Sequence, residues 1–287
     1  MKTIIYFDTL RNRKKFFVYI VIPLIVLVAV FLVFTILDKC FPEFNVTYMK
    51  WPDIVKGLLG LSAWNSHLAV NVWQILSLIY PFYIIYVLMS GLCSSVIQEE
   101  RLETIVYLNN AGVDNRTFFI SKTIIWIAGA FLATMSLLLV NSVLLLLIGA
   151  ARNIIFMVNY YLGLFLICIF YLSIAFFMSS YKKHEEECKD TIVTILLLPW
   201  MISRIPAVLR LFSLILELTG REGKVADVLM MLGERLHPLE MVAPVTWCLT
   251  SVNVTWIYMI CILLIFLIMN TSALLIYEKR HDMMVIR

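Results

Sequence analysis

Paired acidic residues stand at two places where the sequence passes between long apolar runs, and paired carboxylates beside a membrane can serve an intramembrane protease. The pairs are Glu99-Glu100 and Glu186-Glu187. A glutamate-type protease would need an Arg four residues after the second Glu, but Thr104 and Thr191 occupy those positions. No Gly-x-Ser-x-Gly setting for a serine nucleophile is present either. We therefore interpret Glu99-Glu100 as the polar side of a short helix outside the membrane.

Metal and nucleotide chemistry lack their usual residue patterns in this sequence. The text nearest to a phosphate loop, Gly220-Arg221-Glu222-Gly223-Lys224, has the wrong spacing. No H-E-x-x-H pair exists, and the histidines are far apart in sequence, at His67, His184, His237 and His281. We expect no metal on this chain, no ATP hydrolysis by it, and no enzymatic activity of its own.

Arg204 and Arg210 follow an apolar run closely, so they are the most interesting charges near the membrane. An ionisable residue inside a membrane span is by default a functional hypothesis, which would place both side chains on a transport pathway. The alternative is that both extend to the outer interface from the end of a short fifth span. The sequence favours the outer interface, and Glu217 is a candidate ion-pair partner for either arginine.

The elements that must position these residues are long apolar segments. Hydrophobic residues make up 62% of the 287 residues and charged residues 15%, whereas a soluble domain has about 45–50% and about 25%. The bilayer is therefore the predicted solvent. No basic run interleaved with aromatics indicates a nucleic-acid partner. We predict an all-α membrane protein, one domain over 1–287, with six transmembrane helices at 16–37, 68–97, 123–151, 153–180, 191–209 and 252–277.

The ends and loops of the chain indicate its orientation. Residues 1–15 are basic and predict an interfacial helix, with an unstructured basic tail as the alternative. Residues 16–37 are too long for a signal peptide, and no small-x-small cleavage site follows. Fourteen Lys and Arg residues fall on the side of the termini and seven on the other side. This bias predicts a multi-pass plasma-membrane protein with both termini in the cytoplasm.

The outer side is expected to carry the less regular parts of the chain. Residues 204–245 mix apolar segments with charges, in pieces too short to span the bilayer, and short helices dipping into the outer membrane face fit this pattern. Cys40 and Cys248 both fall in predicted outer loops. A disulfide between them is an alternative that spacing alone does not establish.

A polar segment, residues 98–116, separates two uncharged runs and must leave and re-enter one membrane face. Leu102, Ile105 and Val106 have the i, i+3, i+4 spacing of one helix face. Gly112 suits a helix stop, and Asp114 suits the cap of the next helix. The segment therefore predicts a short amphipathic helix that another protein can grip.

Three stretches resemble the permease subunits of type-2 ABC exporters. Residues 8–16, Asp-Thr-Leu-Arg-Asn-Arg-Lys-Lys-Phe, lead into a span with Pro23, like the family's interfacial helix and first span. Residues 100–122 carry Glu-Arg-x-Glu-Thr-Ile-x-x-Leu, then Gly-Val-x-x-Arg and Lys122, and resemble the family's coupling helix, although Glu103 replaces the usual Gly before Thr104. Residues 204–245 look like its re-entrant helices between spans five and six.

The resemblance implies a function. Two permease chains, identical or homologous, would line a pathway in the lipid bilayer, and two separate ATPase subunits would bind ATP and Mg. The chain would contact its ATPase through Glu99, Glu100, Arg101, Leu102, Glu103, Thr104, Ile105, Val106, Tyr107 and Leu108. The alternatives are a non-transporting membrane sensor or assembly factor, an intramembrane enzyme, and a self-contained secondary carrier.

Overall fold

The computed structural model describes residues 2–41, 68–101, 110, 112–182, 184–219, 223–237 and 256–285. This part of the chain contains seven α-helices and one short 3-10 helix: α1 (Lys2–Cys40), α4 (Leu68–Arg101), α6 (Asn115–Leu147), η1 (Ala151–Asn153), α7 (Ile154–Tyr181), α8 (Glu185–Leu218), α9 (Lys224–Arg235) and α11 (Trp256–Val285). Six of the helices contain a segment long and apolar enough to cross a membrane. The predicted all-α, multi-pass membrane architecture is confirmed at this level.

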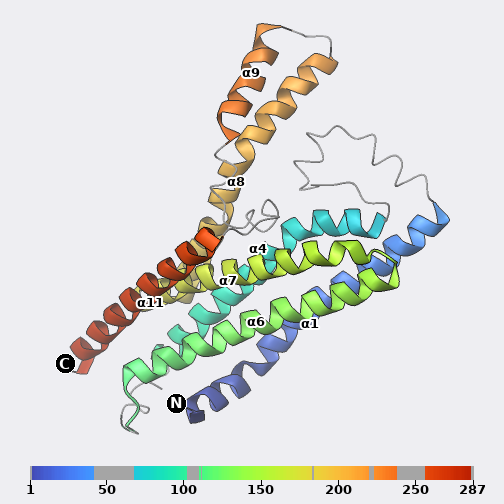
Figure 1. Cartoon of the computed structure of the whole chain (residues 1–287). Coiled ribbons are helices and arrows are strands. Elements are labelled where there is room, and N and C mark those ends of the chain that lie inside the picture. The colour runs from blue at the N-terminus through green and yellow to red at the C-terminus, as the bar shows by residue number, and fades with distance from the viewer. Residues whose placement is uncertain are drawn as a thin grey trace.

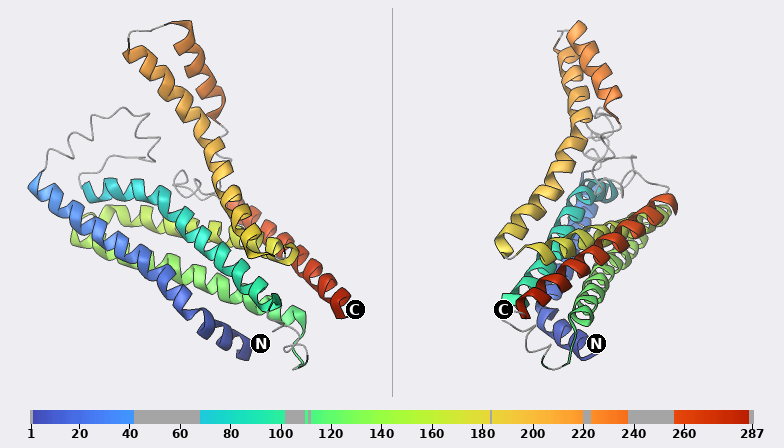
Figure 2. Two further views of the ribbon diagram at one scale, coloured as in Figure 1. Left: turned by 180° about the vertical axis from the view of Figure 1, so that it is seen from behind. Right: turned by 90° about the vertical axis from the view of Figure 1, so that its left-hand side faces the viewer.

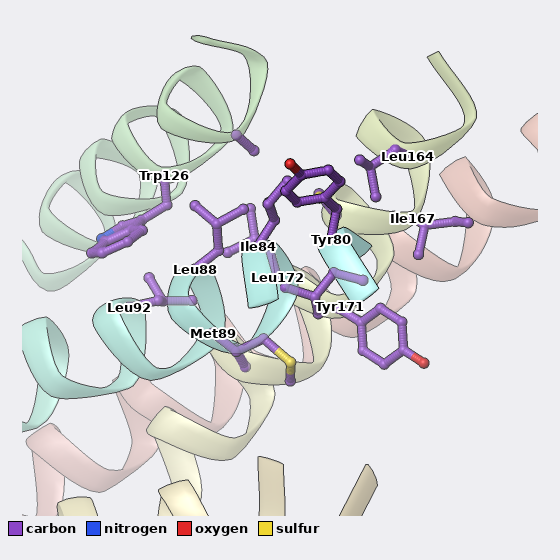
Figure 3. Packing of buried hydrophobic residues seen from close by; sticks show 14 of the residues in the cluster. Tyr80, Ile84, Leu88, Met89, Leu92, Trp126, Leu164, Ile167, Tyr171 and Leu172 are labelled. Atoms are coloured by element: carbon purple, nitrogen blue, oxygen red, sulfur yellow. The ribbon is translucent and has the colours of Figure 1, made fainter. Parts of the chain in front are cut away.

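The long helices form a bundle with α4 and α7 at its centre (Figure 1). Most of the apolar segment of each central helix is buried, whereas only 17% of that segment is buried in α1 and in α11. α1 packs on α4 and α6, and α11 packs on α7. Figure 3 shows the middle of the core, where Ile84 and Leu88 of α4 lie near Leu172 of α7. The exposed apolar faces are those expected to meet lipid.

Two glycines allow helices of the bundle to approach closely. A Cβ atom on Gly91 in α4 would overlap the ring of Trp126 in α6, and one on Gly129 in α6 would overlap the ring of Phe16 in α1. The Phe16 and Trp126 rings are themselves in contact, with centroids 4.9 Å apart. Small residues at such crossings give membrane helices their van der Waals packing. Trp126 thereby becomes the meeting point of α1, α4 and α6.

The basic N-terminus is helical and joins the first span directly. Residues 1–15 were expected to form an interfacial helix leading into that span, with an unstructured tail as the alternative, and α1 is continuous from Lys2 to Cys40. No Gly or Pro separates the basic stretch from Phe16, so nothing in the sequence ends the helix there. Pro23 lies inside α1 without ending it, as neighbouring helices allow in membrane proteins.

The fifth long helix also exceeds its predicted length. Instead of ending at residue 209, α8 continues past Pro206 to Leu218, and α9 then folds back along it. Ser213 Oγ in α8 donates to the Ala226 carbonyl in α9 at 2.8 Å. Together they form a hairpin that projects from the bundle (Figure 2). α9 has only 12 residues, too few to cross a bilayer, so the described part of 204–245 holds no additional span.

The chain ends identify the two ends of the bundle. The N- and C-terminal ends lie at the same end as the close of α4 and the start of α6 (Figure 1). We call this the terminal end, and we call the opposite end, from which α8 and α9 project, the hairpin end. The shared location of the two termini is what six membrane crossings require. α4 ends and α6 begins at the terminal end (Figure 1).

Candidate coupling site at the terminal end

A buried ion pair joins the last turn of α4 to the start of α6. Lys122 Nζ lies 2.5 Å from Glu99 Oε1, and the two side chains are only 1% and 7% exposed. Glu99 precedes the end of α4 at Arg101 by two residues, and Lys122 is the eighth residue of α6. The pair therefore braces the two helices that enter and leave residues 102–111.

Burial makes this pair a strong constraint on helix position. A charge removed from water is costly unless an opposite charge and hydrogen bonds compensate it, so neither side chain is stable there without its partner. Removing one member of a buried pair typically costs about 3–5 kcal/mol. Sliding or rotating α4 against α6 would separate the charges and carry a similar penalty. The two helix ends are therefore expected to move together.

An aromatic cluster supports the lysine and extends the site to α7 and α11. Lys122 Nζ lies 5.3 Å from the ring centroid of Phe118, a cation–π contact. Phe118 stacks on Tyr277 of α11, with centroids 6.2 Å apart and an interplanar angle of 19°. Phe119 contacts Tyr277 at 5.7 Å and Phe176 of α7 at 5.1 Å. A displacement at the start of α6 is thus transmitted to both helices.

Trp126 connects the same region to α1. Its Nε1 donates to Ser95 Oγ in α4 at 3.3 Å, and its ring occupies the space left by Gly91. The Phe16 ring of α1 also contacts the Trp126 ring, tilted by 49°. Trp126 is one helical turn beyond Lys122, so the indole and the ion pair connect α4 and α6 at adjacent turns.

The start of α6 is fixed by a capping residue. Asp114 is the N-cap, and its Oδ1 accepts a hydrogen bond from the Thr117 backbone N–H at 3.2 Å. Interaction with the Thr117 side-chain hydroxyl is the main reason why the pKa of the Asp114 carboxyl lies below its ordinary value, and the backbone N–H of Thr117 lowers that pKa further. The prediction that Asp114 caps this helix is confirmed. Gly112 has φ of +79° in the preceding turn, a conformation that glycine adopts without a Cβ clash.

A second contact at the terminal end joins α4 to α8. The Glu185 carboxylate lies beside Ser94 and Gln98 of α4. It also forms an i, i+4 ion pair with Lys189 at 2.8 Å, with side chains 29% and 43% exposed. This pair faces water more than Glu99–Lys122 does, so its contribution to stability is expected to be small. α4 is thus held on two sides, by α6 and by α8.

The structure places the predicted coupling residues unequally. Glu99 was assigned to the exposed rim of an ATPase contact, but its side chain is buried inside the bundle. Only the backbone of Glu100 and Arg101, at the end of α4, is described. The remaining predicted contact residues lie outside the described residues: Leu102, Glu103, Thr104, Ile105, Val106, Tyr107 and Leu108.

The two membrane-proximal arginines lie in α8, away from this site. The Arg204 guanidinium lies 5.7 Å from the ring centroid of Trp200, and Trp200 packs edge-on against Phe82 of α4. Arg210 Nε donates to the Pro206 carbonyl at 3.4 Å and packs within the hairpin. Arg210 therefore has a structural role in α8, and neither arginine approaches Glu99–Lys122.

Lys122 is the functional candidate whose role the sequence did not reveal. It was noted as part of a family-like stretch, but its pairing with Glu99 across 23 residues was not anticipated. A lysine directly before the uncharged run 123–151 is the signal that pointed to it. A buried lysine needs a counter-charge, and Glu99-Glu100 are the acidic residues at the matching end of the preceding apolar run.

The described residues bear only in part on a metal site and on the alternative Cys40–Cys248 disulfide. Among the residues that the structure describes, no three His, Cys, Asp or Glu side chains come together as possible metal ligands. Cys40 is exposed at the end of α1, and Cys248 lies outside the described residues.

Comparison with known proteins leaves the chain without a family assignment. No protein-family model, curated protein or solved structure matches it. Its helix lengths and hydropathy make it a multi-pass membrane protein. Its specific function must therefore be inferred from its own residues.

Proposed function

We propose that this chain is the transmembrane subunit of an ATP-driven exporter of the type-2 ABC class. Two such chains would form the pathway, and two separate ATPase subunits would bind at the terminal end, which faces the cytoplasm of a plasma-membrane protein. The observation that carries the proposal is the buried Glu99–Lys122 pair. It connects the two helices that flank the amphipathic segment, to which another protein can bind. A force applied to that segment would therefore move both helices together within the membrane.

The proposed contact with the ATPase follows from the sequence of the connecting segment. Leu102, Ile105 and Val106 supply the apolar anchors, which usually dominate the energy of a protein interface. Glu100 and Glu103 contribute charges at the rim, where they adjust association and register more than affinity. The chain carries no phosphate loop, so ATP and Mg belong to the partner subunit.

Movement would then travel along contacts that the structure contains. Glu99–Lys122 makes α4 and α6 respond together, and the Trp126–Phe16 contact passes the movement to α1. Tyr277, between Phe118 and Phe119, passes it to α11. Binding of ATP can shift such an assembly between two states only if the ATPase holds the connecting segment differently in each. A non-transporting sensor or assembly factor would need no ATP-driven movement, so energy coupling separates the two classes.

The test is co-purification of an ATP-hydrolysing partner from native membranes. The wild-type chain should bring an ATPase with it, in about equal amounts. Ile105→Asp combined with Val106→Asp should abolish that partner, because charged residues replace apolar anchors. The matched control is Asn110→Asp, which adds a charge to an exposed position and should leave binding intact.

Two results would contradict the proposal. One is wild-type protein that carries no ATPase under conditions that preserve its fold. The other is undiminished ATPase binding to the double variant, with activity still coupled to transport. If the double variant unfolds, the stripe packs on this chain's own helices, and the proposed contact is wrong. Folding is measured by monodisperse elution in detergent and by the unfolding temperature.

A further inference from the structure

Two buried cysteine thiols lie together between α4 and α8. Cys93 and Cys188 are each 0% exposed, and their thiols are close enough to influence each other's ionisation. Cys93 Sγ is also 3.5 Å from the Ala175 carbonyl of α7. Both cysteines are reduced in the structure. The coupling function proposed above uses neither thiol.

The packing of α4 and α8 independently supports this contact. The two helices run in opposite directions, and Phe82 packs on Trp200, with ring centroids 5.6 Å apart. Cys93 lies 11 residues after Phe82, and Cys188 lies 12 residues before Trp200, which corresponds to about 17 Å and about 18 Å along the two helices. The same antiparallel register therefore brings the two cysteines to one level. About one turn closer to the terminal end, the same register places Glu185 of α8 beside Gln98 of α4.

We propose that Cys93 and Cys188 are a redox-sensitive pair, whose oxidation to a disulfide fixes α4 against α8 at the terminal end. A single buried cysteine usually acts as a small apolar side chain. Two neighbouring thiols on packed helices can in addition be joined by a disulfide, which requires their Cα atoms to lie within about 7 Å of each other. The bond would lie about 9 Å along α4 from Glu99, since six residues separate Cys93 from it. The inference rests on this placement and not on the proposed transport function.

The reaction needs an oxidant, and a low-molecular-weight disulfide supplies it. Cys188 lies at the end of the first turn of α8, so opening of that turn exposes its thiol first. Its thiolate attacks one sulfur of the external disulfide, which releases one small thiolate and leaves a mixed disulfide. The Cys93 thiolate then attacks the Cys188 sulfur and releases the second small thiolate. Two protein thiols are oxidised, one external disulfide is reduced, and the two protons neutralise the released thiolates.

The test uses the purified full-length chain in detergent, treated with oxidised glutathione. Free thiols are then blocked with a maleimide under denaturing conditions, and the digested protein is analysed by mass spectrometry. We expect one peptide pair linked through Cys93 and Cys188, reversed by dithiothreitol. Oxidation should also raise the unfolding temperature of the wild type and slow amide exchange in the first half of α8. Cys93→Ala and Cys188→Ala should each abolish the linked peptide and the shift in unfolding temperature.

Two controls make a negative result informative. Cys40 is exposed and should form a mixed disulfide with glutathione, which shows that the reagent is active. Cys168→Ala removes another buried thiol, in α7, and should leave the linked peptide unchanged. The inference is overturned if Cys40 is modified while Cys93 and Cys188 both remain maleimide-reactive. It is equally overturned if each carries glutathione without a link between them.

Discussion

Replacing the members of the Glu99–Lys122 pair, singly and together, tests whether they brace α4 and α6. Lys122→Met keeps the length of the side chain but removes the positive charge that faces the buried Glu99 carboxylate. With the two side chains 1% and 7% exposed, solvent screens this charge little. We therefore expect each single Met substitution to cost about 3–5 kcal/mol of unfolding free energy. Glu99→Met combined with Lys122→Met leaves no buried charge, and such replacements are often neutral or stabilising by about 1–4 kcal/mol.

The assay is a double-mutant cycle on denaturant-induced unfolding in detergent, followed by tryptophan fluorescence. The double variant should be less destabilised than the sum of the single variants by at least about 3 kcal/mol. Additivity within about 0.5 kcal/mol would refute the reasoning, because residues that do not interact behave in that way. Lys189→Met removes the more exposed Glu185–Lys189 pair and is the matched control, with an expected cost of about 0–1 kcal/mol.

Two further predictions concern the hairpin and the start of α6. Gly233→Leu should destabilise the hairpin by about 1–3 kcal/mol through overpacking, because a Cβ there would lie 2.6 Å from Arg210 Cγ. Limited proteolysis should detect the opening of the hairpin. The control Gly223→Leu should not open it, because a Cβ at Gly223 has nothing within 4 Å. Asp114→Ala should increase amide exchange at Thr117. Because the pKa of Asp114 is lowered in the folded state, the stabilisation of α6 by the ionised carboxyl should be complete above about pH 4. It should be lost as the pH falls through the lowered pKa of the folded state. Amide exchange at Thr117 that stays unchanged on acidification of the wild type would contradict this.

The sequence predicts the membrane helices well because lipid imposes a simple requirement. Each span needs about 20 apolar residues; five uncharged runs satisfy this requirement, and the fifth span, 191–209, meets it with Arg204 included. The boundaries were less predictable. α8 remains helical beyond Pro206 and Arg210, where α9 packs against it through the contact between Gly233 and Arg210. This contact belongs to the tertiary structure, so local helix propensity did not predict it.

The candidate site was predictable only in part. The cap at Asp114 depends on neighbouring residues, so its local pattern was sufficient. The pairing of Glu99 with Lys122 depends on the relative axial positions of α4 and α6. The periodicity of the sequence predicts each helix but not its position relative to the other. Because Glu99 belongs to a polar segment, its carboxylate was assigned to solvent. The structure shows that it is buried because it pairs with Lys122. The two thiols between α4 and α8 were hidden for the same reason, since 95 positions separate them in the chain.

The length of α8 has a consequence for the bilayer itself. Beyond Asp190 the helix continues for 28 residues to Leu218, about 42 Å at 1.5 Å per residue. At a typical tilt of about 20° this projects about 39 Å, about 9 Å more than the hydrocarbon thickness. Containing the helix completely would need a tilt of about 45°, beyond the usual range. Acyl-chain length should therefore shift the depth at which α9 sits, so that membrane thickness becomes a variable to which this protein responds.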